Sequence, residues 1–235
     1  MTSKLPYPFI RGASIGSIGI ALLIAGNAHA ASLTARGNEP GWQIVITDDA
    51  IDFSTMDGVA VSVQPVPPAT TANEVVVYSA TIEGSPFSLV VVDKICSDTM
   101  TGMPFPKTVA VVMGDQNFIG CGGESLSLLL GDWQVEEIGG QGVIIESEAS
   151  VAFDLDGSLH GNSSCNRFFG GFALTAEGLT ISDIGGTRMA CDPGRMEQEQ
   201  RFFSALEAVR RFESLPDGRL RLIGEDGRAV VSARK

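Results

Sequence analysis

Residues 160–172 read HGNSSCNRFFGGF, and Cys165 within this stretch is one of four cysteines in the 235-residue chain. Cys96 and Cys121 stand 25 positions apart, and Cys165 and Cys191 stand 26 apart. The two pairs lie in different halves of a chain that begins with an apparent export signal. An even cysteine count in an exported protein favours disulfides, because the compartment oxidises thiols. We therefore predict one local disulfide in each half; four free buried thiols are the alternative.

Residues 1–30 have the features of a signal peptide. Two cations precede an uncharged apolar run at residues 12–26. This run is shorter than the roughly 20 residues that a membrane-spanning helix needs. Ala28-His29-Ala30 then places small residues where signal peptidase requires them, which predicts cleavage before Ala31. We expect a periplasmic or secreted protein with no integral membrane span in its mature form; an uncleaved N-terminal anchor is the competing interpretation.

The chain is strongly acidic. Loss of Lys4 and Arg11, and of no acid, takes its net charge from −12 to −14 on cleavage. Such a surface is repelled by nucleic-acid phosphates and by anionic lipids. The sequence therefore predicts no nucleic-acid partner, and the acidity itself is explained by solubility.

The first half of the chain consists of short runs rich in β-branched and aromatic residues. Turn pairs such as Asp57-Gly58 and Glu83-Gly84 separate these runs, and no helical periodicity lies between them. Three prolines in residues 65–73 predict a loop there. Residues 31–123 are thus predicted to form a small antiparallel β sheet or barrel. Its predicted strands are residues 42–46, 59–63, 75–78, 87–92 and 109–112.

Residues 124–235 are predicted to form a second small domain, joined to the first by a short connection near Gly123. The expected fold is an antiparallel β sheet covered by one α-helix, so the whole chain is mainly β with a minor helical part (α+β). The Asp156-Gly157 pair is a strong hairpin signal between two of its strands. The predicted strands are residues 133–138, 143–145, 151–155, 158–161, 179–181, 219–223 and 229–233.

The one predicted helix begins at Asp192, a typical N-cap, followed by Pro193 at the first helical position. Apolar residues then recur at steps of mainly three and four, which predicts an apolar face that covers the sheet. Arg210 and Arg211 are expected near its C-terminal end, where cations suit the helix dipole. The apolar face comprises Phe202, Phe203, Leu206, Val209 and Phe212.

The second half resembles the META domain, of the HslJ-like heat-shock family. Residues 160–172 are similar to its G-x-x-G-C-N-x-F/Y-x-G-x-Y element, with Ser164 where a glycine is usual. Thr187-Arg188-Met189-Ala190-Cys191 resembles its T-x-M-A-C element, and Gly131-Asp132-Trp133 resembles its opening strand. The resemblance implies a bacterial cell-envelope location and a link to stress or antibiotic tolerance, and it implies no enzyme. We expect a structural role for the motif residues Asn166, Arg167, Phe168, Thr187 and Met189.

The first half resembles an uncharacterised module of bacterial envelope proteins that accompanies META domains. The similar residues are those of Gly37-Asn38-Glu39-Pro40-Gly41-Trp42, Cys96-Ser97-Asp98-Thr99-Met100-Thr101-Gly102, Pro106 and Gly120-Cys121-Gly122-Gly123. This resemblance implies an architecture and no activity.

Few residues point to catalysis. His160 is the one histidine beyond residue 30, and it lies beside a predicted turn, so a nucleophile–histidine arrangement would have to centre on it. No C-x-x-C or H-x-x-H pairing suggests zinc, and no glycine-rich motif suggests a nucleotide. We predict no enzyme, no metal and no cofactor. Weaker alternatives are a calcium site at Asp154, Asp156, Glu225 and Asp226, and a carboxylate pair for hydrolysis drawn from Glu39, Asp93 and Asp98.

The remaining function class is binding or structural support. We predict a non-catalytic envelope protein that recognises an envelope protein or a hydrophobic ligand. The alternative is a periplasmic inhibitor of a lytic enzyme or protease, which would insert an exposed loop into its target. The candidate loop is Met103-Pro104-Phe105-Pro106, because prolines make it rigid. The competing interpretation is a turn that places Phe105 in the core.

Overall fold

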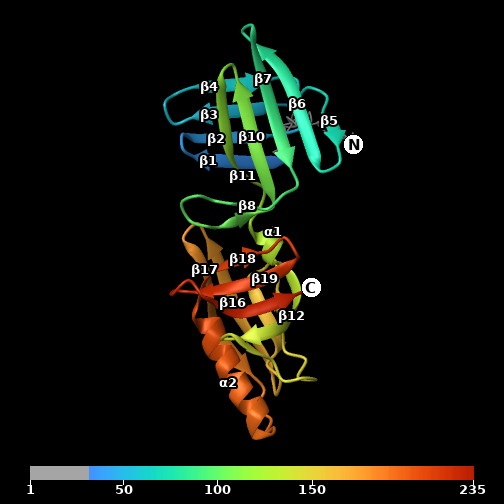
Figure 1. The fold of residues 1–235 in the computed structure, drawn as a ribbon, viewed down its shortest axis with the longest axis vertical. Helices are drawn as coiled ribbons and strands as arrows, with labels where there is room; N and C mark the ends of the chain where they lie inside the picture. The colour runs from blue at the N-terminus through green and yellow to red at the C-terminus, as the bar shows by residue number, and fades with distance from the viewer. Residues whose placement is uncertain (1–31) are drawn as a thin grey trace, which may run out of the picture.

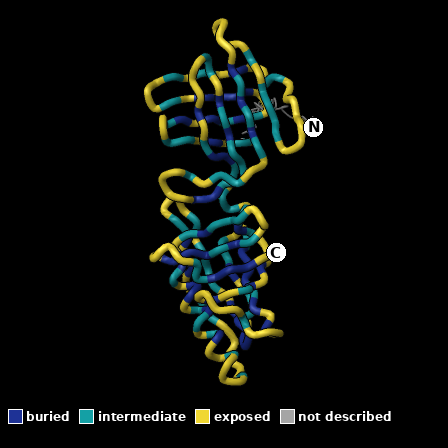
Figure 2. Tube along the Cα trace, in the orientation of Figure 1, coloured by how far each residue is buried: buried dark blue, intermediate teal, exposed yellow. Residues whose placement is uncertain are grey.

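The structure, a computed structural model, describes residues 32–235, and the predicted signal peptide lies outside them. Two antiparallel sheets of nine strands each follow one another along the longest axis of the molecule (Figure 1). Each sheet surrounds its own cluster of buried apolar residues (Figure 2). The mainly β character is as predicted.

The N-terminal sheet has the strand order β4-β3-β2-β1-β11-β10-β7-β6-β5. In Figure 1, β1 to β4 run across the view, whereas β6, β7 and β10 run nearly along the long axis. The sheet therefore folds over itself and encloses buried residues such as Phe53, Leu89 and Val109. Its strands are β1 (Leu33–Asn38), β2 (Gly41–Ile46), β3 (Ile51–Thr55), β4 (Ala60–Val63), β5 (Thr70–Ala72), β6 (Val75–Ile82), β7 (Ser85–Val92), β10 (Lys107–Met113) and β11 (Gln116–Gly122).

All five strands predicted for the first half are present, and four more join them. β1 and β11 have less regular patterns of buried and exposed residues. β3 does alternate, with Ile51 and Phe53 buried and Asp52 and Ser54 exposed, but it was not among the predicted strands. The predicted loop at residues 65–73 was partly wrong. Its last part forms β5, whose residues are all exposed and pair with β6 at the edge of the sheet.

The C-terminal sheet has the order β17-β16-β15-β14-β12-β20-β19-β18, with β13 paired to β12. Its two edges meet: a Cβ on Gly178 of β17 would lie 2.2 Å from the carbonyl oxygen of Arg210 in β18. Only glycine fits that approach. The strands are β12 (Gly131–Ile138), β13 (Gln141–Gly142), β14 (Ser150–Phe153), β15 (Ser158–Asn162), β16 (Arg167–Thr175), β17 (Gly178–Gly186), β18 (Val209–Ser214), β19 (Arg219–Gly224) and β20 (Ala229–Arg234).

Helix α2 (Pro193–Glu207) starts where the sequence predicts. The Asp192 side chain accepts a hydrogen bond from the Arg195 backbone N–H at 3.1 Å, as an N-cap does. Phe202 and Leu206 of this helix are fully buried.

The predicted C-terminal end of this helix was wrong, because Val209, Arg210, Arg211 and Phe212 belong to β18. Residues three apart on a regular strand face opposite sides. A bulge between Val209 and Arg211 shifts the register, so that Val209 and Phe212 both point into the core. The spacing of three residues between Val209 and Phe212 therefore resembled that of a helix face.

Other segments also differ from prediction: strands β13 and β16 were not among the predicted strands. Helix α1 (Leu126–Leu129) was not expected; it is a single turn, and its Leu129 carbonyl accepts a 2.7 Å hydrogen bond from the Trp133 indole N–H. Residues 143–145, predicted as a strand, form an irregular segment followed by a turn.

A small hairpin lies at the joint between the two sheets (Figure 1). It consists of β8 (Cys96–Ser97) and β9 (Pro104–Phe105), and we call it the joint hairpin. The predicted disulfide Cys96–Cys121 is present, with a Cα–Cα distance of 5.4 Å, and ties the joint hairpin to β11. Met103 is 5% exposed and belongs to the core of the C-terminal sheet. The joint hairpin thus contacts both sheets.

Candidate functional site

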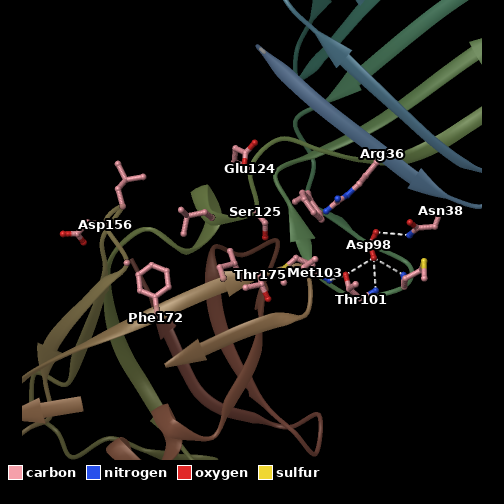
Figure 3. A pocket seen from close by; sticks show the side chains of 17 residues that line it. Arg36, Asn38, Asp98, Thr101, Met103, Glu124, Ser125, Asp156, Phe172 and Thr175 are labelled. Carbon is pink, nitrogen blue, oxygen red and sulfur yellow. Dashed lines mark hydrogen bonds between the residues drawn. The ribbon is translucent and has the colours of Figure 1, made fainter. Parts of the chain in front are cut away.

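A cavity of about 710 Å³ lies beside the joint hairpin (Figure 3). We call it the groove. Arg36 and Asn38 reach it from β1, Asp98 and Met103 come from the joint hairpin, and Phe172 comes from β16. Its large apolar lining residues are Met100, Met103, Phe105, Leu126, Leu155, Phe172 and Leu174. The groove combines a largely apolar surface with a few polar groups, as ligand sites do.

Asp98 organises the loop of the joint hairpin. Its Oδ1 accepts hydrogen bonds from the Thr101 backbone N–H and hydroxyl, both at 2.8 Å, and from the Met100 N–H at 3.1 Å. Its Oδ2 accepts a 2.9 Å hydrogen bond from the Asn38 side chain on β1. One carboxylate therefore shapes the loop and joins it to the N-terminal sheet (Figure 3).

The pKa of Asp98 lies below its ordinary value of 3.8. Burial, the largest single effect, raises this pKa, but the hydrogen bonds from Asn38, Thr101 and Met100 lower it and together outweigh burial. A folded-state pKa below the unfolded value stabilises the fold above about pH 4, and the contribution is lost as pH falls through the folded pKa.

We therefore expect acidification from pH 5 to pH 2 to loosen the joint hairpin. The amide chemical shift of Thr101, followed by NMR, should move toward its random-coil value over this range. An Asp98→Asn variant should lack the transition. A Thr101 signal that stays constant down to pH 2 in the wild type would contradict this account.

Charged groups surround the groove. The Arg36 guanidinium lies 5.6 Å from the centre of the Phe105 ring, and among residues 32–235 it makes no ion pair. Asp156 lies at the tip of the β14–β15 turn, and the Ser158 side chain and backbone lower its pKa by hydrogen bonding. Glu124 adds a second exposed carboxylate. The lining of the groove therefore includes one cation, two exposed carboxylates and the hydrogen-bonded carboxylate of Asp98.

The predicted binding loop at residues 103–106 is not the exposed loop that we expected. Met103 and Pro104 are buried, and Phe105 and Pro106 are half-buried. Phe105 packs against the core of the C-terminal sheet, in agreement with the competing interpretation. The physical reason is that the disulfide and Asp98 fold this segment back between the sheets. Met103 and Phe105 nevertheless line the groove, so their role in binding remains a prediction.

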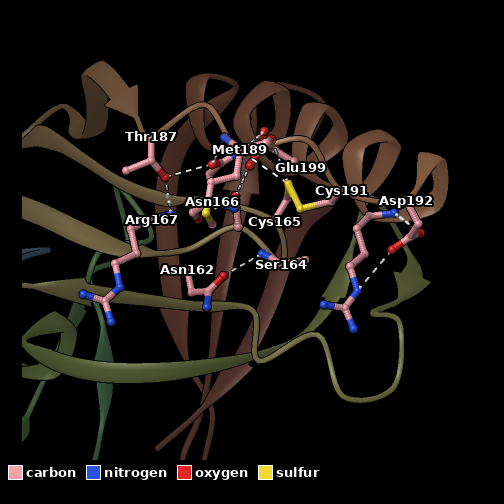
Figure 4. Close-up of a disulfide and its surroundings, with 12 residues drawn as sticks. Asn162, Ser164, Cys165, Asn166, Arg167, Thr187, Met189, Cys191, Asp192 and Glu199 are labelled. Carbon is pink, nitrogen blue, oxygen red and sulfur yellow. Dashed lines mark hydrogen bonds and ion pairs between the residues drawn. A yellow bond between two sulfur atoms is a disulfide. The ribbon is translucent and has the colours of Figure 1, made fainter.

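A second cluster surrounds the predicted disulfide Cys165–Cys191, whose Cα atoms are 5.9 Å apart (Figure 4). Asn166 is 3% exposed, and its side-chain oxygen accepts hydrogen bonds from the Thr187 hydroxyl and the Met189 N–H, both at 2.8 Å. Its amide donates to Glu199 Oε1 at 3.1 Å. Asn166 therefore links the disulfide turn, the segment after β17 and helix α2.

Residues 126–235 match the META domain family model. This match starts at helix α1 and includes the whole C-terminal sheet, so we call it the META region. No curated protein matches the chain. An NMR structure of a protein from Burkholderia xenovorans is similar, with 23% identity and a TM-score of 0.39, over 46% of this chain and 85% of that one. A second NMR structure is similar at 23% identity and a TM-score of 0.37, over 46% and 92% of the two chains.

The other motif residues of the META region occupy different environments. Phe168 is buried under α2, as expected, whereas the Arg167 side chain is exposed and points away from the disulfide (Figure 4). Met189 is 60% exposed and contributes its backbone to Asn166. The left-handed residue of this turn is Ser164, with φ of 91°.

Replacing Asn166 by alanine is expected to lower the free energy of unfolding by about 2 kcal/mol. The variant would leave the Met189 N–H and the Thr187 hydroxyl without their partner in a partly buried site, and it would remove the hydrogen bond to Glu199. Urea unfolding measures the change. Asn117→Ala, at an exposed position in β11, is the control and should stay within about 0.5 kcal/mol of the wild type. Equal stability of the two variants would contradict a structural role for Asn166.

The weaker catalytic candidates are scattered. His160 is exposed and lies 3.2 Å from Asp154 Oδ2, while Asp93 pairs with Lys107 at the other sheet. Within residues 32–235, no group of three or more His, Cys, Asp or Glu side chains is arranged to hold a metal ion. The same part of the chain has no helix that is long and apolar enough to cross a membrane.

The sequence did not indicate most of the groove. Arg36 lies more than 100 positions before Leu155, Phe172 and Leu174, and it forms no recognisable motif with them. The prolines around Phe105 suggested a binding role, whereas Asn38, Asp98 and Phe172 drew attention as family-like residues.

Proposed function

We propose that this protein is an exported, non-catalytic binding factor of the bacterial cell envelope, related to the HslJ-like stress proteins, that holds a partly apolar ligand in the groove. The observation that carries this proposal is the groove itself, with its apolar lining beside Arg36. A ligand with an apolar body and an anionic group would bury its body against Leu155 and Phe172 and place its charge near the guanidinium.

The proposed location and architecture have separate support. The signal-like residues 1–30 support export, and the match of residues 126–235 supports a stress-related or binding family. The separate cores of the two sheets support two folding units, with a boundary near Gly123. The N-terminal unit would be the envelope module that accompanies META domains, and the groove would form where the two units meet.

Fluorescence titration with 1-anilinonaphthalene-8-sulfonate tests the groove, because this probe joins an apolar ring system to an anion. Leu155→Asp should weaken binding by about 10- to 100-fold, because it removes exposed apolar surface and adds a repelling charge. Arg36→Ala should weaken binding by about two- to fivefold, as expected for an exposed charge pair. Met56→Asp is the matched control, since Met56 is 89% exposed outside the groove. Equal effects of Leu155→Asp and Met56→Asp would reject the groove as the binding site.

Inhibition of a lytic enzyme or protease remains the alternative. It requires a protruding segment, and residues 103–106 do not supply one. Any inhibitory contact would have to come from another part of the surface.

A further inference from the structure

The segment between β13 and β14 presents an isoleucine at the tip of a turn. Ile145 is 87% exposed and Ile144 is 38% exposed, whereas Ser147 and Ala149, farther along the same segment, are buried. We call residues 144–148 the docking loop. Ile145 at its tip does not line the groove and does not belong to the core of the META region.

The buried side chain of Gln198 binds the docking loop through hydrogen bonds. Gln198 of α2 is fully buried; its Oε1 accepts a 2.7 Å hydrogen bond from the Ile144 N–H, and its Nε2 donates to the Ser147 hydroxyl at 3.1 Å. The Ser147 N–H donates to the Ile144 carbonyl at 3.1 Å and closes the turn. The exposed tip, Ile145 and Glu146, is therefore fixed on both sides.

Gln198, which holds the docking loop, is itself held in place by a further contact. Gln198 Nε2 also contacts the hydroxyl of Ser164, which precedes Cys165 of the disulfide. The docking loop, α2 and the disulfide turn therefore form one hydrogen-bonded unit. A surface that is already ordered loses little conformational entropy when it binds.

The chemistry of the docking loop indicates the kind of partner. Glu146 and Glu148 are exposed and have φ of 65° and 47°, a backbone region in which glycine is the usual residue. The chain thus places carboxylates beside Ile145 although glycine would suit this backbone better. We propose that the docking loop is a preformed interaction surface that inserts Ile145 into an apolar pocket of a protein partner whose rim carries lysine or arginine. The two carboxylates complement such a rim, and the central aliphatic side chain supplies the buried contact.

The experiment uses the full exported chain with a benzophenone amino acid at position 145, irradiated in the envelope of the cells that produce it. The same probe at position 56 is the control, because Met56 is equally exposed on the other sheet. The protein captured from position 145 alone is identified, purified and titrated by calorimetry with wild-type and variant chains at low and high salt.

We expect Ile145→Asp to weaken the affinity for that protein at least 100-fold, and Ile145→Ala to weaken it about 10-fold. The double variant Glu146→Gln, Glu148→Gln should bind more weakly at low salt and show a smaller salt dependence. Since Ile145 is exposed, none of the position-145 variants should change the melting temperature. The proposal is overturned by the absence of an adduct, by an adduct with a second copy of this chain, or by affinity that Ile145→Asp leaves unchanged. The groove is not involved in this test, so its outcome is independent of probe binding there.

Discussion

Replacing Phe168 by alanine is expected to lower the free energy of unfolding of the C-terminal sheet by about 3–5 kcal/mol. The Phe168 ring is 3% exposed and packs edge to face on Phe202 and Phe203, with centroid distances of 5.6 and 5.5 Å. It also covers Gly161 of β15, where an added Cβ would lie 2.9 Å from the ring. Alanine would leave a cavity between the sheet and α2 that neither element can fill without moving.

Urea unfolding followed by tryptophan fluorescence measures this effect. The chain has two tryptophans, and Trp42 and Trp133 are buried in different sheets. A Trp42→Phe background therefore reports the C-terminal sheet alone. Phe169→Ala is the matched control, because Phe169 is the next residue and is 65% exposed; it should change stability by less than about 0.5 kcal/mol. If Phe168→Ala kept wild-type stability but lost ligand binding, the residue would belong to a binding surface.

Replacing Cys96 and Cys121 together by serine is expected to lower the free energy of unfolding by about 3–4 kcal/mol. The disulfide closes a loop with a sequence separation of 25, and this range follows if the bond acts by restricting the unfolded chain. A local effect should accompany the global one. The joint hairpin has two strands of two residues each, so the disulfide, Asp98 and buried Met103 supply most of its attachment.

Hydrogen exchange of the amides in residues 98–103 detects the local effect. In the Cys96→Ser, Cys121→Ser variant these amides should exchange faster than the strands of either sheet, and probe binding in the groove should weaken. The variant Cys165→Ser, Cys191→Ser is the control, because it removes a disulfide of similar loop length from the META region and leaves the joint hairpin attached. The same loss of hairpin protection in both variants would show that the effect is global only.

Local sequence patterns predicted much of the fold correctly. All five strands predicted for the first half exist, and so do the start of α2 at Pro193 and the Asp156-Gly157 hairpin. These features depend on residues close together in the chain: a proline after an N-cap, a glycine at a turn, or a run of β-branched side chains. Both disulfides also agree with the prediction.

The errors arose where distant contacts decide the local structure. Val209 and Phe212 have the spacing of a helix face, but a bulge in β18 places both in the core of the sheet. Residues 143–145 have the composition of a strand, yet Gln198, more than 50 positions away, binds this backbone and turns it into an exposed loop. Residues 103–106 resemble an exposed loop, but the disulfide to Cys121 folds them between the sheets.

The sequence by itself determined the β-rich class, the acidic charge, the cysteine pairs and the residues that build the disulfide turn around Asn166. The tertiary structure alone decided the candidate sites. The groove requires Arg36, Phe105, Leu155 and Phe172 to meet, and the exposure of Ile145 depends on Gln198. Each of these contacts joins segments far apart in the chain, and their cost in chain entropy is offset only when the complete sheets assemble. No local pattern could therefore have revealed them.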